Sequence, residues 1–117
     1  MNYRIVTTKD FESNFKRLSK KYHSLVNDYE TLIEELLANP ALGDDLGDNT
    51  RKVRMAIASK RRGKSGGARV ITCTVLLNVE DTDIYLLTIY DKSEQQSISP
   101  KIIKYLKGKN GLGRIQS

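Results

Sequence analysis

The 117 residues include one cysteine, one histidine and no tryptophan. The single cysteine, Cys73, cannot form an internal disulfide, so a reducing compartment such as the cytoplasm is expected. One cysteine and one histidine, His23, disfavour a zinc site, and a lone histidine excludes catalysis by a histidine pair. No stretch reaches the roughly 18 apolar residues of a membrane span, and the first residues lack the apolar core of a signal peptide. We therefore expect a soluble cytoplasmic protein without a metal or cofactor.

Carboxylates are also missing from the middle of the chain, because none occurs between Asp48 and Glu80. Residues 1–50 hold 6 basic and 9 acidic residues, a net charge of −3, whereas residues 51–117 hold 14 and 5, a net charge of +9. This surplus of cations favours a polyanionic partner, namely nucleic acid, an anionic membrane or an acidic protein. A chain of this length is expected to form one domain over residues 1–117.

Two amphipathic helices are predicted after a short strand at Tyr3–Thr7. Apolar residues recur at helical spacing in two successive stretches, and Thr8 or Asp10 provides an N-cap for the first. The first set is Phe11, Phe15, Leu18 and Tyr22, and the second is Leu25, Tyr29, Leu32 and Leu36. A turn joins the two stretches and Asn39-Pro40 ends the second, so we expect an antiparallel helical hairpin.

Three strands are predicted in the second half of the chain. In residues 51–57, apolar side chains alternate with Lys52 and Arg54, which is the pattern of a strand with one core face and one cationic face. Two later runs are rich in β-branched residues and are bounded by turn residues. The remaining expected segments are strands at Ala68–Leu77 and Ile84–Tyr90, a loop at 41–50 and a flexible tail at 108–117.

The predicted order of elements, β-α-α-β-β-β-α, belongs to the α+β class. The helical hairpin is expected to pack on one face of an antiparallel sheet. A short C-terminal helix begins at Ser99-Pro100, with Ser99 as N-cap, and is expected to turn Ile102, Ile103 and Leu106 inward. The opposite face of the sheet would then display the cations of the strand at 51–57 and of the loop that follows it.

The expected loop after the strand at 51–57, together with the start of the next strand, covers residues 58–69 and reads ASKRRGKSGGAR. It contains five cations, three glycines and no carboxylate. The stretch approaches a phosphate-binding P-loop, but that motif opens a helix and a strand is expected here, so this type of nucleotide site is not favoured. A solvated hairpin turn is the plain alternative. Cations on the adjoining strands, Lys52, Arg54 and Arg69, favour a groove for a phosphodiester chain instead.

A second polar stretch, YDKSE at 90–94, follows the expected central strand. It is either a strand end entering a turn, with Tyr90 half-buried, or a functional group of side chains. In the second case Tyr90 offers a stacking surface, Lys92 stabilises negative charge, and Glu94 accepts a proton. The residues alone leave both alternatives open.

Two runs together, GKSGGARVI at 63–71 and LLTIYDKSE at 86–94, resemble toxins of the RelE/ParE superfamily, especially its HigB-like RelE branch. The resemblance implies a RelE-like domain that enters the ribosomal A site and cuts mRNA without a metal. The ribose 2′-OH attacks the adjacent phosphate and the 5′-oxygen leaves. It also implies a cognate antitoxin, of helix-turn-helix type, which neutralises a monomeric toxin.

The resemblance also suggests roles for individual residues. Arg69 matches a position that holds the scissile phosphate, and Tyr90 would stack on an unpaired base. The transition-state charge would be stabilised by Lys60, Lys64 and Lys92. Either Glu94 or a lysine with a lowered pKa would act as the base. The further residues expected to contact nucleic acid are Lys52, Arg54, Arg61 and Arg62.

Some features depart from the family. Several relatives carry a catalytic tyrosine or histidine near the C-terminus. In this sequence the only aromatic residue in that region is Tyr105, which lies inside the expected last helix. The acid and the base therefore stay unassigned. Two other functions also stay open: a ParE-like inhibitor of DNA gyrase, which is not a nuclease, and a basic nucleic-acid-binding module. The nuclease hypothesis requires the cations to converge in one pocket.

Overall fold

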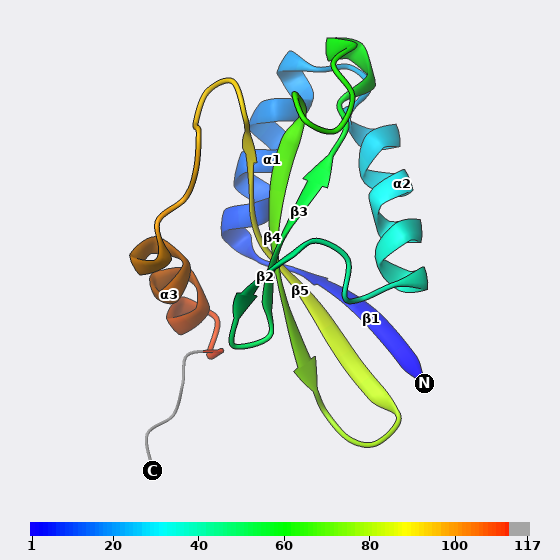
Figure 1. The fold of residues 1–117 in the computed structure, drawn as a ribbon, viewed down its shortest axis with the longest axis vertical. Helices are drawn as coiled ribbons and strands as arrows, with labels where there is room; N and C mark the ends of the chain where they lie inside the picture. The colour runs from blue at the N-terminus through cyan, green and yellow to red at the C-terminus, as the bar shows by residue number, and fades with distance from the viewer. Residues whose placement is uncertain (113–117) are drawn as a thin grey trace.

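The computed structural model describes residues 1–112, which form an α+β fold with a helical hairpin, an open five-stranded sheet and a short C-terminal helix (Figure 1). The predicted fold class is confirmed. The strands are β1 (Asn2–Thr7), β2 (Asp44–Gly47), β3 (Thr50–Met55), β4 (Ala68–Leu76) and β5 (Asp81–Asp91). The helices are α1 (Lys9–Lys21), α2 (Leu25–Ala38), α3 (Pro100–Lys109) and a single 3₁₀ turn, η1 (Ala58–Lys60).

The sheet has the strand order β1-β5-β4-β3-β2 and is mixed rather than antiparallel throughout. Strands β2 to β5 form an antiparallel meander, but β1 runs parallel to β5. The prediction of an antiparallel sheet is therefore wrong for β1. The helical hairpin follows β1 directly and carries the chain across the sheet, so β1 pairs with the last strand of the meander instead of the next one. The predicted loop at 41–50 also contains the short edge strand β2.

The helical hairpin covers one face of the sheet, as predicted. Thr8 caps α1, because its hydroxyl accepts a hydrogen bond from the backbone N–H of Phe11 and donates to the carbonyls of Leu86 and Leu87. This cap ties the start of α1 to β5. The core below the hairpin is made by buried residues from α1 and α2 and from the strands: Phe11, Leu18, Leu25, Leu32, Leu36, Val53, Met55, Ile57, Ala68, Val70, Ile84, Leu86 and Ile89.

The other face of the sheet is partly covered by α3, which leaves β5 by a long loop and returns over the sheet (Figure 1). Ser99 caps α3 and Pro100 is in its first turn, as predicted. Ile103 packs on a second cluster that contains Cys73. Ile102 was expected to face inward but is about half exposed, since only one side of so short a helix can meet the sheet.

The predicted flexible tail begins too early at residue 108. Helix α3 continues to Lys109, and Leu112 still packs against the cluster around Ile71 and Cys73. The rest of that predicted tail, residues 113–117, lies outside the described residues. Within residues 1–112, no helix has both the length and the apolar character needed to cross a bilayer.

Candidate nucleic-acid interface

Three polar side chains from neighbouring strands lie in one row across the sheet. Arg54 of β3 is paired with Arg69 of β4, which is paired in turn with Tyr90 of β5. Residues in direct register across a sheet project to the same face, here the face that α3 covers only in part. Two arginines opposite each other repel, and no carboxylate among residues 1–112 forms an ion pair with either. The row therefore carries two positive charges that no carboxylate of the described residues neutralises.

Arg69 is only 6% exposed, and backbone oxygens hold its guanidinium group. One terminal nitrogen donates to the carbonyls of Lys64 (3.1 Å) and Ala68 (3.2 Å), and the other donates to that of Ser65 (3.0 Å). A guanidinium group has five N–H donors, so two remain for another acceptor. Arg69 therefore both organises the preceding loop and keeps a fixed pair of donors.

Gly67 makes the approach of the loop to β3 possible. A Cβ atom at this position would lie 2.1 Å from the carbonyl oxygen of Met55, so only glycine fits. The carbonyl of Gly67 also accepts a hydrogen bond from the backbone N–H of Lys92, which extends the β4–β5 ladder by one residue. The glycines predicted to be turn residues thus place the start of β4 beside both neighbouring strands.

Tyr90 is 5% exposed, and its hydroxyl has no hydrogen-bond partner among the described residues. Burial raises the pKa of this phenol, while the nearby charge of Arg69 lowers it by less. Because the ring of Tyr90 is buried, it offers no exposed face on which a base could stack, so the structure does not support the predicted stacking. The hydroxyl is the group with unused hydrogen-bonding capacity, beside the spare donors of Arg69.

Lys92 is in the turn after β5, and its backbone N–H donates to the carbonyl of Gly67. Its neighbours Asp91 and Ser93 both turn their side chains to Lys60 on the hairpin face, so the side chain of Lys92 points to the other face. Its ammonium group donates to the carbonyl oxygen of Gln96 at 2.8 Å and to the side-chain oxygen of the same residue at 3.3 Å. No carboxylate among residues 1–112 pairs with it. Of the three predicted catalytic lysines, Lys92 is the one that the structure brings to the face of Arg54, Arg69 and Tyr90.

Lys60 lies on the opposite face, in a buried polar network. Its ammonium group is 2.7 Å from one carboxylate oxygen of Asp91, and the two side chains are 9% and 0% exposed. The hydroxyl of Tyr22 donates to the other oxygen of Asp91. The N–H and the hydroxyl of Ser93 both donate to the same oxygen as Lys60. Burial raises the pKa of Asp91, but the hydrogen bonds from Lys60, Tyr22 and Ser93 outweigh it and hold this pKa well below its usual range.

The predicted catalytic role of Lys60 is therefore not supported by its position. The residue joins η1 to the end of β5 and to the end of α1, which is a structural task. The network also gives Tyr22 and Asp91 a structural role, because both bind the end of β5 to its neighbours. The sequence analysis did not predict this role for either residue. The only available signal was that Asp91 directly follows an apolar strand.

Lys64 and Glu94 are paired with the helical hairpin. The ammonium group of Lys64 is 3.0 Å from a carboxylate oxygen of Glu35 in α2. Glu94 accepts from Lys21 and Arg17 of α1, each at 3.1 Å, and the hydrogen bond from Lys21 is the main reason that the pKa of Glu94 is lowered. A carboxylate with a lowered pKa is a weaker proton acceptor, so Glu94 is poorly suited to act as the base.

The remaining predicted contacts with nucleic acid occupy two places. Arg61 and Arg62 are exposed in the loop after η1 and have no side-chain partner among the described residues, and Arg61 adopts a left-handed backbone conformation with a φ of 57°. Lys52 lies two residues before Arg54 on the same face of β3 and lines a cleft beside α3. The prediction that all these cations converge in one pocket is therefore wrong. Lys60 and Lys64 face the helices and are paired with carboxylates, and Lys52, Arg54 and Arg69 lie on the other face of the sheet.

Comparison with models of known protein families gives no match to this chain. The described residues also contain no group of three or more histidine, cysteine or carboxylate side chains placed to hold a metal ion. Any functional assignment therefore rests on the geometry of this interface. Its members are Arg54, Arg69, Tyr90 and Lys92, and we refer to these four residues as the arginine row.

Proposed function

We propose that this protein is the toxin of a type II toxin–antitoxin pair, acting in the cytoplasm as a ribosome-dependent mRNA endoribonuclease of the RelE type. The observation that carries the proposal is the pairing of Arg54 with Arg69 on adjacent strands without any carboxylate partner in residues 1–112. Like charges placed opposite each other destabilise a sheet. An anionic ligand such as an RNA backbone would relieve that repulsion.

The proposed chemistry uses the RNA, the arginine row and solvent water. The ribose 2′-oxygen forms a bond to phosphorus, the bond from phosphorus to the 5′-oxygen breaks, and a 2′,3′-cyclic phosphate remains. Negative charge grows on the phosphate oxygens in the transition state. The two spare donors of Arg69 suit those oxygens, and the Lys92 ammonium group suits the departing oxygen. The proton of the 2′-OH passes to a water molecule, and the 5′-oxygen takes up a proton from water.

In this proposal the free toxin is a monomer, and a cognate antitoxin neutralises it. The toxin acts in the ribosomal A site, where the message is presented as a single strand. Arg54, Arg61 and Arg62 contact its backbone or the surrounding rRNA. All three side chains are exposed, and no carboxylate among residues 1–112 forms an ion pair with them, which supports that role.

The test compares Arg54→Ala and Lys92→Ala with the parent protein in a cell that expresses each from an inducible promoter. Growth is followed, and the ends of messages are mapped by primer extension. Losing one transition-state contact lowers a rate by roughly 10²–10³-fold, so Lys92→Ala should abolish both cleavage and growth arrest. Arg54→Ala should weaken both. Lys16→Ala is the matched control, because Lys16 is an exposed cation on α1, on the other side of the sheet.

Circular dichroism of each purified variant verifies that the fold persists. Codon-linked cuts that vanish in Lys92→Ala, with Lys16→Ala fully active, support the proposal. If Arg54→Ala and Lys92→Ala both cut messages like the parent protein, the proposed site is wrong. DNA damage with intact messages would point to a gyrase inhibitor instead, and unimpaired growth on induction of the parent protein would leave a plain nucleic-acid-binding module.

A further inference from the structure

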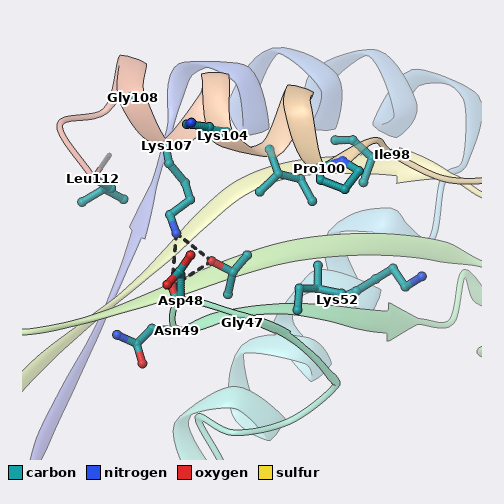
Figure 2. Close-up of a pocket in the computed structure, with 13 residues that line it drawn as sticks. Gly47, Asp48, Asn49, Lys52, Ile98, Pro100, Lys104, Lys107, Gly108 and Leu112 are labelled. Atoms are coloured by element: carbon teal, nitrogen blue, oxygen red, sulfur yellow. Dashed lines mark hydrogen bonds between the residues drawn. The ribbon is translucent and has the colours of Figure 1, made fainter. Parts of the chain in front are cut away.

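A cleft of about 820 Å³ lies between α3 and the hairpin formed by β2 and β3 (Figure 2). It is outside the arginine row, although Lys52 borders both. Figure 2 shows the α3 side chains above it and the β2–β3 turn below, with Lys107 reaching across from one wall to the other. A cleft of this size accepts several side chains of a ligand.

The two walls are held together by Lys107. Its ammonium group donates to the backbone carbonyl of Asp48 (3.1 Å) and to the hydroxyl of Thr50 (3.0 Å). The turn below it has positive φ at Asp48 and Asn49, 50° and 58°, the pattern of a tight two-residue hairpin turn. Lys107 thus links α3 to the β2–β3 turn across the cleft, and the cleft is open in the structure without a ligand.

The lining of the cleft combines aliphatic and cationic groups. Leu46, Ile98, Ile103 and Leu112 supply apolar surface. Three lysines, Lys52, Lys104 and Lys107, line it against one carboxylate residue, the aspartate of the β2–β3 turn. Neither Lys52 nor Lys104 has a side-chain hydrogen bond or ion pair with another residue in the range 1–112. The cleft is thus flanked by two ammonium groups that no carboxylate of the described residues pairs with.

We propose that this cleft docks a peptide segment of another protein that carries acidic and aliphatic side chains. The aliphatic groups would fill the space between Ile98, Ile103 and Leu112, and the carboxylates would pair with Lys52 and Lys104. An RNA strand fits less well, because its charged backbone can form no hydrogen bonds with the aliphatic side chains that line the cleft, Leu46, Ile98, Ile103 and Leu112. A second copy of this chain fits poorly too, because its net charge is +6.

The docked segment would lie next to the arginine row. Lys52 and Arg54 are two residues apart on β3 and share a face, so a peptide held by Lys52 would cover the approach to Arg54. If the proposed function holds, the occupant is an inhibitor. The docking itself does not rest on the proposed function, since it is measured on purified protein without ribosomes.

The experiment selects a random peptide library displayed on phage against the immobilised protein and remeasures the enriched peptides in solution by fluorescence anisotropy. The variant is Lys104→Glu, and its matched control is Lys101→Glu, an exposed α3 lysine that does not line the cleft. Enriched peptides should combine carboxylates with leucine, isoleucine or valine. Their affinity should fall about tenfold in Lys104→Glu and stay unchanged in Lys101→Glu.

Three results would overturn the proposal: no peptide is enriched, the enriched peptides lack acidic residues, or they bind Lys104→Glu as tightly as the parent protein. A single-stranded RNA oligonucleotide is measured in parallel. If Lys104→Glu weakens RNA binding and leaves peptide binding intact, the cleft serves nucleic acid. Self-association of the parent protein that is lost in Lys104→Glu would assign the face to a second copy. The mRNA cleavage by the arginine-row variants tests the proposed function alone, so its failure and the failure of peptide docking can be told apart.

Discussion

Replacing Lys60 by methionine should destabilise the protein strongly, although the sequence favours a catalytic role for this lysine. The change keeps the length of the side chain and removes the ammonium group 2.7 Å from Asp91. Asp91 is fully buried, so its carboxylate would lose its nearest counter-charge in a medium of low polarity. Removing one partner of a buried ion pair costs about 3–5 kcal/mol.

Part of the network would remain in this variant. Tyr22 and Ser93 still donate hydrogen bonds to Asp91, and the ammonium group of Lys21 lies 3.7 Å from it. We therefore expect the lower end of the range, a loss of about 3 kcal/mol in the free energy of unfolding. Urea unfolding followed by circular dichroism measures it, since the chain has no tryptophan for fluorescence.

Lys64→Met is the matched control, because it removes the same group from the same loop at an exposed ion pair. Lys64 and Glu35 are 3.0 Å apart, but their side chains are 52% and 35% exposed. Exposed pairs contribute about 0–1 kcal/mol, so this variant should lose less than about 1 kcal/mol. Equal losses in Lys60→Met and Lys64→Met would refute the argument that burial makes the Lys60 pair important.

The dependence on pH gives a second check of the same network. The folded pKa of Asp91 is lowered relative to an unfolded value of about 3.9, so the carboxylate stabilises the fold above that pH. This stability is lost as the pH falls through the folded pKa. Lys60→Met removes a hydrogen bond that lowers this pKa, so the folded pKa of Asp91 is higher in the variant. The unfolded state is the same in both proteins, so the stability gap between them should be widest above the folded pKa of the variant and should shrink as the pH falls below it. A gap that does not shrink at any pH down to the acid unfolding of the parent protein would contradict the assignment.

Two further changes test the packing around the arginine row. Gly67→Ala should cost about 1–3 kcal/mol, because its Cβ would lie 2.1 Å from the Met55 carbonyl oxygen. The control is Gly108→Ala in α3, where the added atom meets nothing within 4 Å, so this variant should lose no stability in the same urea titration. Tyr90→Phe removes a buried hydroxyl without a partner in the described residues. The free energy of unfolding should therefore stay the same or rise by up to about 1 kcal/mol. A loss larger than that would mean that the hydroxyl is hydrogen-bonded in the folded protein.

The local elements of this fold could be predicted because their signals lie within short stretches of the chain. Helical spacing of apolar residues marked α1 and α2, the alternation around Lys52 and Arg54 marked β3, and Ser99-Pro100 marked the start of α3. Those patterns depend on neighbours within about one or two turns or pleats, so sequence alone carries them. They also predicted correctly that Arg54 projects away from the helical hairpin.

The pairing of distant residues could not be predicted in the same way. The sequence showed five cations in residues 58–69, but it did not show that Lys60 meets Asp91, that Lys64 meets Glu35, or that Arg69 donates to its own loop. These outcomes depend on the register of β3, β4 and β5. A shift of one residue would turn each side chain to the other face.

The amino-acid sequence by itself determined the α+β class, the two helices and the excess of positive charge in the second half of the chain. Tertiary structure alone decided which of those charges are neutralised and which remain available. It placed Lys60 and Lys64 on the face of the helical hairpin, where Asp91 and Glu35 pair with them. It placed Arg54 and Arg69 on the other face, where no carboxylate of residues 1–112 forms an ion pair with either. It also brought α3 back beside β3, and that return created the cleft. Charge is a property of each residue, but an unpaired charge is a property of the folded arrangement.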